Sequence, residues 1–295
     1  ALPQFFQIID DFKLLVYGLL LFGAMRFAPD GVDGLLRRLF QRGGTMKVSR
    51  LSVSDVTVSF GGLRALEKVN LELDDNQLLG FIGPNGAGKT TLMRVIMGLI
   101  RPQSGTVCLN GTDITKLPTV QRVHAGLALG QQIVKPLRQM SLLDNVALAV
   151  GGQKLLSPLH ALFARSRNVE RDTASSLLER VGLGTEMQKR PNEVPLGHLK
   201  RLEVARALAL RPELLLLDEP LAGLSKPEAS AMADLIAGLP RSGLSVILIE
   251  HNLPEVMRVC PNIYVQANGR GLALGPADEI MAMPEVRQAY LGKDV

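Results

Sequence analysis

Aromatic side chains are scarce in this chain of 295 residues, which has no Trp and three Tyr. A protein that binds single-stranded nucleic acid usually stacks bases on aromatic rings and lines its groove with clustered Lys and Arg. The formal net charge is +5, but no basic block stands out along the chain. We therefore expect no nucleic-acid partner.

Cysteine is scarce too, because Cys108 and Cys260 are the only two and lie far apart. Neither belongs to a CxxC or Cys/His spacing, so the sequence indicates neither a disulfide framework nor a zinc site. A reducing compartment fits this usage. The length, with 46% hydrophobic and 21% charged residues, suits one large globular domain or two smaller ones.

Apolar runs long enough to cross a membrane are also missing. Residues 14–25, LLVYGLLLFGAM, would form about 18 Å of helix, whereas a hydrocarbon core is roughly 30 Å thick. Asp10 and Asp11 make the stretch before this run acidic, which disfavours a signal peptide. A buried helix of a soluble domain would find no partner in residues 28–45. We favour the end of a membrane-spanning helix, extended by Phe5, Phe6, Ile8 and Ile9 and followed on the cytoplasmic side by Arg26, Arg37, Arg38 and Arg42.

The first residue is Ala1, and Met46 is the first internal methionine in a context typical of a start. We therefore expect a fragment of a longer polypeptide, with one domain in residues 1–45 and a second in residues 46–295.

Short β-rich runs alternate with helical ones from Lys47 onward. LSVSDVTVSF alternates as a half-buried strand does, whereas LLGFIG, LLLLD and SVILIE are continuous apolar runs typical of a parallel sheet covered on both faces. Helices are expected at 89–99, 228–238 and 254–259. This alternation predicts an α/β fold. Residues 126–210 look mostly helical and show no strand run, which predicts a helical subdomain inserted into the α/β core.

A phosphate-binding loop is the clearest motif. GPNGAGKTT satisfies the pattern G-x-x-x-x-G-K-[ST] between an expected strand and an expected helix. Its glycines let backbone N–H groups face phosphate oxygens, and the helix N-terminus adds partial positive charge. Lys89 is expected to reach the β- and γ-phosphates, and the Thr90 hydroxyl to ligate Mg²⁺. The predicted nucleotide-binding residues of the loop are Gly83, Pro84, Asn85, Gly86, Ala87, Gly88, Lys89, Thr90 and Thr91.

A carboxylate pair ends the apolar run LLLLDEP. Asp218 is expected to hold Mg²⁺, and Glu219 to orient or deprotonate a water molecule; a helix cap is the alternative. His251 ends the run VILIEH and is a candidate γ-phosphate contact, although a lone histidine is more often structural. Gln131 and Gln132 begin the helical stretch, and one of the two is a candidate sensor of Mg²⁺ and the attacking water.

In this order and spacing, GPNGAGKTT, the Gln132 region, LKRLEVARAL, LLLLDEP and ILIEH resemble the ATP-binding subunits of ABC transporters over residues 46–295. The resemblance implies a P-loop core with a helical subdomain, and two such domains in a head-to-tail dimer around two ATP molecules. It assigns Phe60 to adenine stacking and the key glutamine to Gln132. The expected catalytic residues are Glu219, His251 and Gln132, and the expected Mg²⁺ ligands are Thr90, Gln132 and Asp218.

Three stretches resemble the branched-chain amino acid uptake branch: SFGGLRAL, the insertion LLSPLHALFARSRNVERDTASSLLERVGLG and the ending GPADEIMAMPEVRQAYLG. Residues 12–36 are similar to the last membrane helix and tail of the permease subunit of the same systems, which suggests a fused permease and ATPase. The resemblance implies an importer motor on the cytoplasmic face of the bacterial inner membrane. Its partners would be permease subunits and, indirectly, a substrate-binding protein.

Three other functions compete with this interpretation. A urea or short-chain amide importer has a similar ATPase. ABC proteins that act on ribosomes or DNA usually carry two cassettes or long coiled coils, whereas this chain shows one cassette and no heptads. A regulatory nucleotide-binding module of low activity is the third.

The signature stretch VPLGH, residues 194–198, keeps that last alternative open. The family places a serine and two glycines there, aimed at the phosphates of the partner's nucleotide, so Pro195, Gly197 and His198 are expected to face that nucleotide. Pro195 has neither a hydroxyl nor an N–H, and one lost hydrogen bond to a charged phosphate weakens the closed state roughly ten- to a hundredfold. Alternatively, Pro195 is simply the first residue of the signature helix, where its missing N–H is not needed.

A second departure from the family pattern is AGLS, Ala222–Ser225, which lacks the more common final Asp. Both departures fall on elements that act across the dimer. We therefore hypothesise an asymmetric heterodimer with a second ABC ATPase subunit, in which the site built on this chain's own phosphate loop turns over faster.

Overall fold

The computed structural model of the chain describes residues 49–131, 134–155 and 168–291. It divides the chain into two compact units, Ala1–Lys47 and Val48–Val295, and the description below concerns the second. The membrane segment expected within residues 1–45 lies outside the described residues. Among the helices that are described, none has the length and apolar character needed to cross a membrane.

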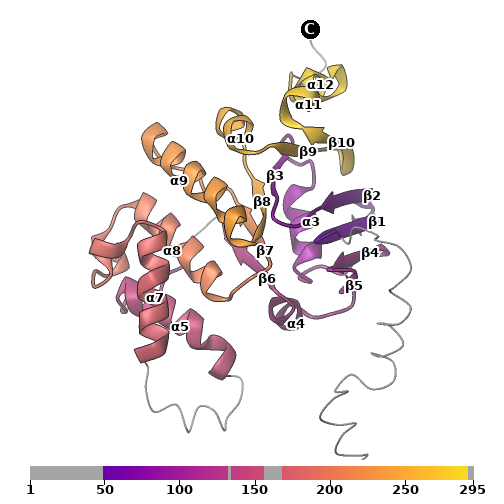
Figure 1. The fold of residues 1–295 in the computed structure, drawn as a ribbon. Helices are drawn as coiled ribbons and strands as arrows, with labels where there is room; N and C mark the ends of the chain where they lie inside the picture. The colour runs from indigo at the N-terminus through magenta and orange to yellow at the C-terminus, as the bar shows by residue number, and fades with distance from the viewer. Residues whose placement is uncertain (1–48, 132–133, 156–167, 292–295) are drawn as a thin grey trace, which may run out of the picture. The chain divides into compact units, whose positions relative to one another are not determined.

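A six-stranded sheet with the order β10-β9-β3-β8-β7-β6 forms the centre of the described unit (Figure 1). All of its strands run parallel except β10, which pairs antiparallel with β9 at one edge. The carboxyl ends of the parallel strands therefore meet at one edge of the sheet, where α/β proteins place their ligands. The strands are β3 (Leu78–Ile82), β6 (Leu127–Gly130), β7 (Leu214–Asp218), β8 (Ser245–Ile249), β9 (Asn262–Ala267) and β10 (Arg270–Pro276).

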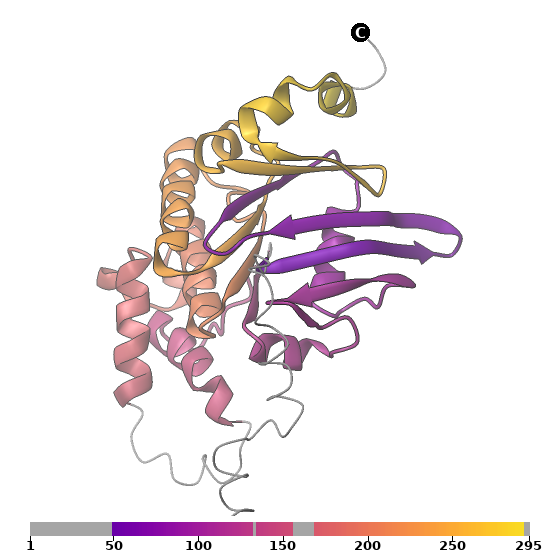
Figure 2. The ribbon, with the colours of Figure 1, turned by 45° about the vertical axis from the view of Figure 1, so that its right-hand side comes forward.

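Both faces of this sheet are covered, which confirms the reading of its apolar runs. On one side lie α8 (Leu196–Ala209) and α9 (Lys226–Gly238), and on the other lie α3 (Lys89–Ile96) and a second sheet (Figures 1 and 2). Successive side chains of a strand point to opposite faces. In β7, Leu215 and Leu217 belong to the apolar cluster under α8 and α9, whereas Leu214 and Leu216 belong to the cluster around α3.

The second sheet is antiparallel, with the order β2-β1-β4-β5. Its first strand alternates as predicted, because Leu51, Val53, Val56 and Val58 are buried and pack over α3. The register shifts between Val53 and Val56, which keeps these side chains on one face. Strand bounds are β1 (Leu51–Phe60), β2 (Leu63–Leu73), β4 (Ser104–Leu109) and β5 (Thr112–Asp113).

The helical part of the unit contains α5 (Leu142–Leu155), α7 (Asn168–Arg180) and the start of α8, grouped on one side in Figure 1. The expectation that residues 126–210 contain no strand is wrong, because Leu127–Gly130 form β6, an edge strand of the central sheet. The run LALG is too short to show a period, and only its pairing with β7 makes it a strand. Short 3₁₀ turns at Gly184–Glu186 (η1) and Pro191–Glu193 (η2) lead into α8.

The predicted helices exist, but their ends differ by a few residues for local reasons. The helix expected over 89–99 ends at Ile96, since Gly98 follows in the left-handed conformation with φ 76°. The helix expected over 228–238 begins at Lys226, because Ser225 and Glu228 form a capping box. The remaining elements are α4 (Thr119–His124), η3 (Leu239–Ser242), α10 (Leu253–Val259), α11 (Ala277–Ala282) and α12 (Pro284–Leu291).

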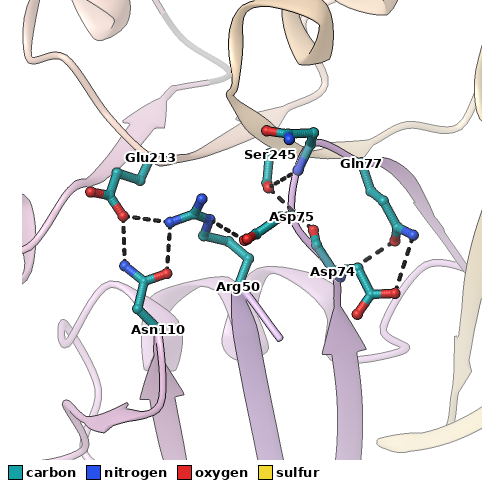
Figure 3. A network of polar contacts seen from close by, with 8 residues as sticks. Arg50, Asp74, Asp75, Gln77, Asn110, Glu213 and Ser245 are labelled. Carbon is teal, nitrogen blue, oxygen red and sulfur yellow. Dashed lines mark hydrogen bonds and ion pairs between the residues drawn. The ribbon is translucent and has the colours of Figure 1, made fainter. Parts of the chain in front are cut away.

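A polar network ties the two sheets together at the amino ends of the parallel strands (Figure 3). Arg50, just before β1, lies with Nε 3.0 Å from Asp75 Oδ1 and donates from Nη1 to both Glu213 and Asn110. Asn110 in turn donates to the same Glu213 carboxylate over 2.6 Å. The network links the residues before β1 and β7 with the turns that follow β2 and β4. It therefore fastens the antiparallel sheet to the central sheet at the edge opposite the phosphate loop.

Candidate active site

The phosphate loop connects the carboxyl end of β3 to α3. Gly86 has φ 77° and Gly88 has φ 97°, so both occupy a conformation that residues with side chains rarely adopt. A Cβ on Gly88 would also lie 2.6 Å from the carbonyl oxygen of Ala65, whereas a Cβ on Gly86 would meet no atom within 4 Å. Gly88 is thus required by packing as well as conformation. Gly86 stands over open space, which is what a backbone that approaches a ligand needs.

Lys89, the first residue of α3, is buried with 7% of its surface exposed. Its Nζ donates to the carbonyl oxygens of Gly83 over 2.6 Å and of Pro84 over 3.0 Å. Burial lowers the pKa of this ammonium group, and the negative charges of Glu219 and Asp218 oppose that shift. The lysine is therefore held inside the loop, next to the two carboxylates predicted to act with it.

The remaining residues of the loop differ in exposure. Asn85, Gly86 and Thr90 are exposed, whereas Gly83 and Ala87 are buried. The buried Gln266 of β9 fixes the loop from behind, since its Nε2 donates to Ala87 O over 2.7 Å. Pro84, Gly88 and Thr91 are half-buried.

Asp218 and Glu219 follow one another at the carboxyl end of β7. Burial raises the pKa of Asp218, the neighbouring charge of Glu219 raises it further, and Lys89 opposes both. Glu219 has φ 47°, a left-handed conformation that is uncommon for this residue type. Its amide donates to Ile249 O over 2.9 Å, which anchors it to the end of β8.

His251 lies two residues beyond the end of β8 rather than at the strand end itself. Its Nε2 is 3.0 Å from Glu219 Oε1, so the structure brings together two residues that are 32 positions apart in the sequence. Lys89, Asp218, Glu219 and His251 thus gather at the carboxyl edge of β3, β7 and β8. Gln131 is exposed just after β6 at the same edge, and Gln132 lies outside the described residues.

Phe60 ends β1 and is 50% exposed, beside the Gly61–Gly62 turn. The next strand passes the phosphate loop, because Ala65 O is the atom that would meet a Cβ on Gly88. The structure therefore shows that Phe60 is exposed and that β2, which follows it, passes the phosphate loop at Ala65.

The signature stretch lies on a separate element. Pro195 is the residue before α8, with φ −69° and ψ 166°, so the expectation that it is the first helical residue is wrong by one position. Its carbonyl accepts from the amides of His198 and Leu199 and so closes the first helical turn. Gly197 is buried against Glu228, whose Oε1 lies 3.0 Å from where a Cβ would stand. His198 is half-buried.

The departure at AGLS has a local explanation. The Ser225 hydroxyl donates to Glu228 Oε2 over 2.6 Å, and the Ser225 amide donates to the same oxygen over 3.0 Å. Serine and aspartate are about equally good at starting a helix. Ser225 therefore satisfies α9 as well as an aspartate would, and the missing Asp does not by itself indicate a weakened function.

Two buried charged residues of the site were missed from the sequence. Lys200 of α8 is 5% exposed, and its Nζ donates to Glu219 O over 3.1 Å. Glu250, between β8 and His251, is 3% exposed. Both left a signal: Lys200 falls on the helical stripe of Gly197, Val204 and Ala207, and Glu250 continues the apolar run VILI.

The donors suit a magnesium ion. A carboxylate at Asp218 and a hydroxyl at Thr90 are hard oxygen ligands, and Mg²⁺ is usually bound by one or two carboxylates together with phosphates and waters. Among the described residues, no group of three or more His, Cys, Asp or Glu gathers as a protein-only metal site.

Comparisons with known proteins agree with this geometry. A family model described as ABC transporter matches residues 66–222, and one described as branched-chain amino acid ATP-binding cassette transporter matches residues 272–295. The chain is 36% identical over 249 residues to the high-affinity branched-chain amino acid transport ATP-binding protein LivG of Escherichia coli, which covers 82% of this chain and 98% of that protein. BraF of Pseudomonas aeruginosa, of the same description, is 35% identical with the same coverage.

A solved structure gives the same result. The crystal structure of the ADP conformation of an ATP-binding cassette of an ABC transporter matches with a TM-score of 0.74 and 28% identity. The match covers 83% of this chain and 99% of that one. Together with the phosphate loop and the carboxylates at the same sheet edge, these matches place the chain in a family: it belongs to the ATP-hydrolysing ATP-binding cassettes of ABC transporters.

Proposed function

We propose that this chain is the ATP-binding and hydrolysing motor of an importer for branched-chain, hydrophobic amino acids. The observation that carries the proposal is the convergence of Lys89, Asp218, Glu219 and His251 at one sheet edge. The substrate class is supported by the match at residues 272–295 and by the relatives LivG and BraF, which are named for branched-chain amino acid transport. In this proposal the chain does not contact the amino acid, which other subunits of the importer bind and carry.

The phosphate loop holds the nucleotide. The backbone N–H groups of the loop, apart from Pro84, which has none, and Ala87, whose N–H donates to Pro84 O, face the phosphates. Lys89 exchanges its bonds to loop carbonyls for bonds to phosphate oxygens. We assign Phe60 to stacking on the adenine ring, as the family resemblance implies, and its half-exposed ring at the end of β1 is accessible for that contact. These contacts give affinity without hydrolysis.

Glu219 and His251 are the proposed catalytic residues for hydrolysis. Glu219 accepts a proton from the attacking water, and the 3.0 Å contact with His251 Nε2 fixes the direction of its carboxylate. His251 also faces the γ-phosphate. Thr90, Asp218 and Gln132 would hold Mg²⁺, which when bound neutralises charge on the phosphate oxygens.

The signature stretch acts on the nucleotide of a second ABC ATPase subunit. Leu196 is 45% exposed beside Gly197, so the start of α8 is open to a partner. Pro195 offers that nucleotide no N–H, and the His198 amide is used within the helix on the Pro195 carbonyl, so the Gly197 amide is the donor left to face it. We therefore assign the slower turnover to the partner's site in a heterodimer. Replacing Pro195 by Ser should raise turnover at the partner's site, and an unchanged rate in the assembled complex would contradict the asymmetry.

The remaining partners follow from the same assignment. Permease subunits span the membrane, and a substrate-binding protein delivers the amino acid to them. We place the chain on the cytoplasmic face of a bacterial inner membrane. Residues 12–36 resemble a permease tail, so we propose that residues 1–45 end a fused permease domain. Limited proteolysis of membranes should then leave residues 1–45 with the membrane fraction.

Uptake and hydrolysis measured together test the motor. Wild type and Glu219→Gln should bind ATP equally, while the variant loses hydrolysis by a factor of a hundred or more, as expected when a general base is removed. Cells with the wild-type system should take up labelled leucine, and cells with the variant should not. Equal background hydrolysis in both proteins would identify a regulatory module. Uptake of urea or acetamide in place of leucine would identify the alternative importer.

A further inference from the structure

A buried lysine on the signature helix reaches back into this chain's own site. Lys200 is the fifth residue of α8, about 6 Å along the helix from its start. Its Nζ donates to the carbonyl oxygen of Glu219 over 3.1 Å. Burial lowers the pKa of this ammonium group, and the nearby carboxylate of Glu250 is the strongest influence that opposes the shift. Lys200 is therefore a charge placed in the core beside an acid.

That acid joins the two loops that carry the predicted catalytic groups. Glu250 Oε1 accepts from the amide of Leu221 over 2.6 Å, and Oε2 accepts from the amide of His251 over 3.2 Å. Leu221 lies two residues after Glu219 on the loop that follows β7. A single buried carboxylate thus fixes the loop after β7 to the loop after β8.

Glu219 itself needs such support. Its φ of 47° is a left-handed conformation that a glutamate adopts only when its surroundings impose it. The amide of Glu219 is held by Ile249 O, and its carbonyl is held by Lys200 and by the amide of Ala222. Both ends of the residue are therefore tied down, and the cation of Lys200 provides the strongest kind of donor.

We propose that Lys200 and Glu250 are positioning residues for ATP hydrolysis: Lys200 holds the carbonyl of Glu219, and Glu250 holds the amides of Leu221 and His251. Together they keep Glu219 and His251 in their 3.0 Å contact. The inference rests on the proposed catalytic role of Glu219. It also gives α8 two functions, because the turn at its start faces the partner's nucleotide while its fifth residue supports this chain's own carboxylate.

Hydrolysis by the full chain in its assembled transporter tests the proposal. Lys200→Met keeps the length of the side chain but removes the donor, and Glu250→Gln keeps one acceptor but aims an NH₂ group at a backbone amide. Each should lower kcat about tenfold or more and leave the Kd for ATP unchanged, because a small misplacement of a catalytic group slows the chemical step. Lys200→Arg, which keeps a cationic donor, should recover at least half of the wild-type kcat.

The controls separate the possible failures. Lys189→Met removes an exposed lysine of the same helical part and should leave kcat and Tm unchanged. If Lys200→Met and Glu250→Gln lower Tm while kcat per folded protein stays at the wild-type value, the pair is merely structural and the inference is wrong. If Glu219→Gln hydrolyses ATP at the wild-type rate, the proposed function fails first. A double variant no slower than either single variant supports a shared role, whereas fully multiplied losses contradict it.

Discussion

The two ends of the central parallel sheet treat charge in opposite ways. At the amino end, opposite charges pair: Arg50 lies between Asp75 and Glu213, and Asn110 completes the network (Figure 3). At the carboxyl end, the adjacent carboxylates of Asp218 and Glu219 lie together in a partly buried place, and two buried lysines, Lys89 and Lys200, lie near both. One end is arranged to hold the fold together, and the other concentrates charge where a ligand would relieve it.

The difference teaches where a pattern of strain indicates function. Residues with shifted pKa values cluster at functional sites, because catalysis needs groups that are not at their most stable. The carboxyl end carries two further unfavourable features: the left-handed backbone of Glu219 and the buried carboxyl group of Glu250. Structural ion pairs, by contrast, satisfy their groups. The predictions below test whether the two ends can be disturbed separately.

The largest effect is expected at the amino side of the sheet. Arg122 of α4 is 1% exposed and donates to four carbonyl oxygens, two of them at the end of α3. Arg122→Met leaves buried carbonyls without this donor and should lower the free energy of unfolding by about 4 kcal/mol. Urea denaturation measures the change. Arg101→Met, which removes an exposed arginine nearby, should change it by less than about 0.5 kcal/mol.

A loss below about 1 kcal/mol for Arg122→Met would show that other donors or water replace the guanidinium, and the amino side would then be less tightly built than we infer.

The next effect is a pH dependence at the carboxyl end. Burial raises the pKa of Glu250 from its ordinary 4.5 to about 7, and the charge of Glu219 adds to it, while amide donors oppose. As pH rises from 4.5 to 7, the unfolded chain loses this proton before the folded chain does, so stability falls. The resulting loss in the free energy of unfolding reaches about 3 kcal/mol at pH 8, since one pKa unit corresponds to about 1.4 kcal/mol.

Glu250→Gln removes this titration. Wild type should therefore lose stability relative to the variant between pH 5 and pH 8, with Lys200, Glu219 and His251 present in both proteins as common background. Urea denaturation of the two proteins across this pH range measures the difference. A constant difference would mean that Glu250 keeps an ordinary pKa in the folded chain.

A smaller effect on free energy, but a clear one on binding, is expected at Lys89. Lys89→Met removes two charge-assisted phosphate contacts and should weaken ATP binding about a hundredfold, which corresponds to about 2.7 kcal/mol. Stability should hold, because the change also removes a buried charge. Calorimetric titration with ATP and Mg²⁺ measures the affinity, and the exposed Lys116→Met serves as the matched control. Lost stability with intact binding would reverse the roles we assign to the two ends.

These expectations also show how far the sequence reaches. The apolar runs predicted β3, β7 and β8, and the glycine pattern predicted the loop before α3, because each depends on neighbours along the chain. The contact of Glu219 with His251 depends instead on the pairing of β7 with β8, which brings Asp218 opposite Ile249. No local pattern contains that register. The four-residue β6 was missed for the same reason.

Arg50 provides the smallest and most selective test. Arg50→Met breaks the contacts with Asp75 and Glu213, whose side chains are 57% and 50% exposed, so the unfolding free energy should fall by only about 1 kcal/mol. The loss should shrink as NaCl is raised from 50 to 500 mM, because salt screens exposed charges. The affinity for ATP should not change, since the network lies at the edge opposite the phosphate loop. A weakened ATP affinity with unchanged stability would mean that the two ends of the sheet are coupled through its strands, and that the amino end serves the site as well as the fold.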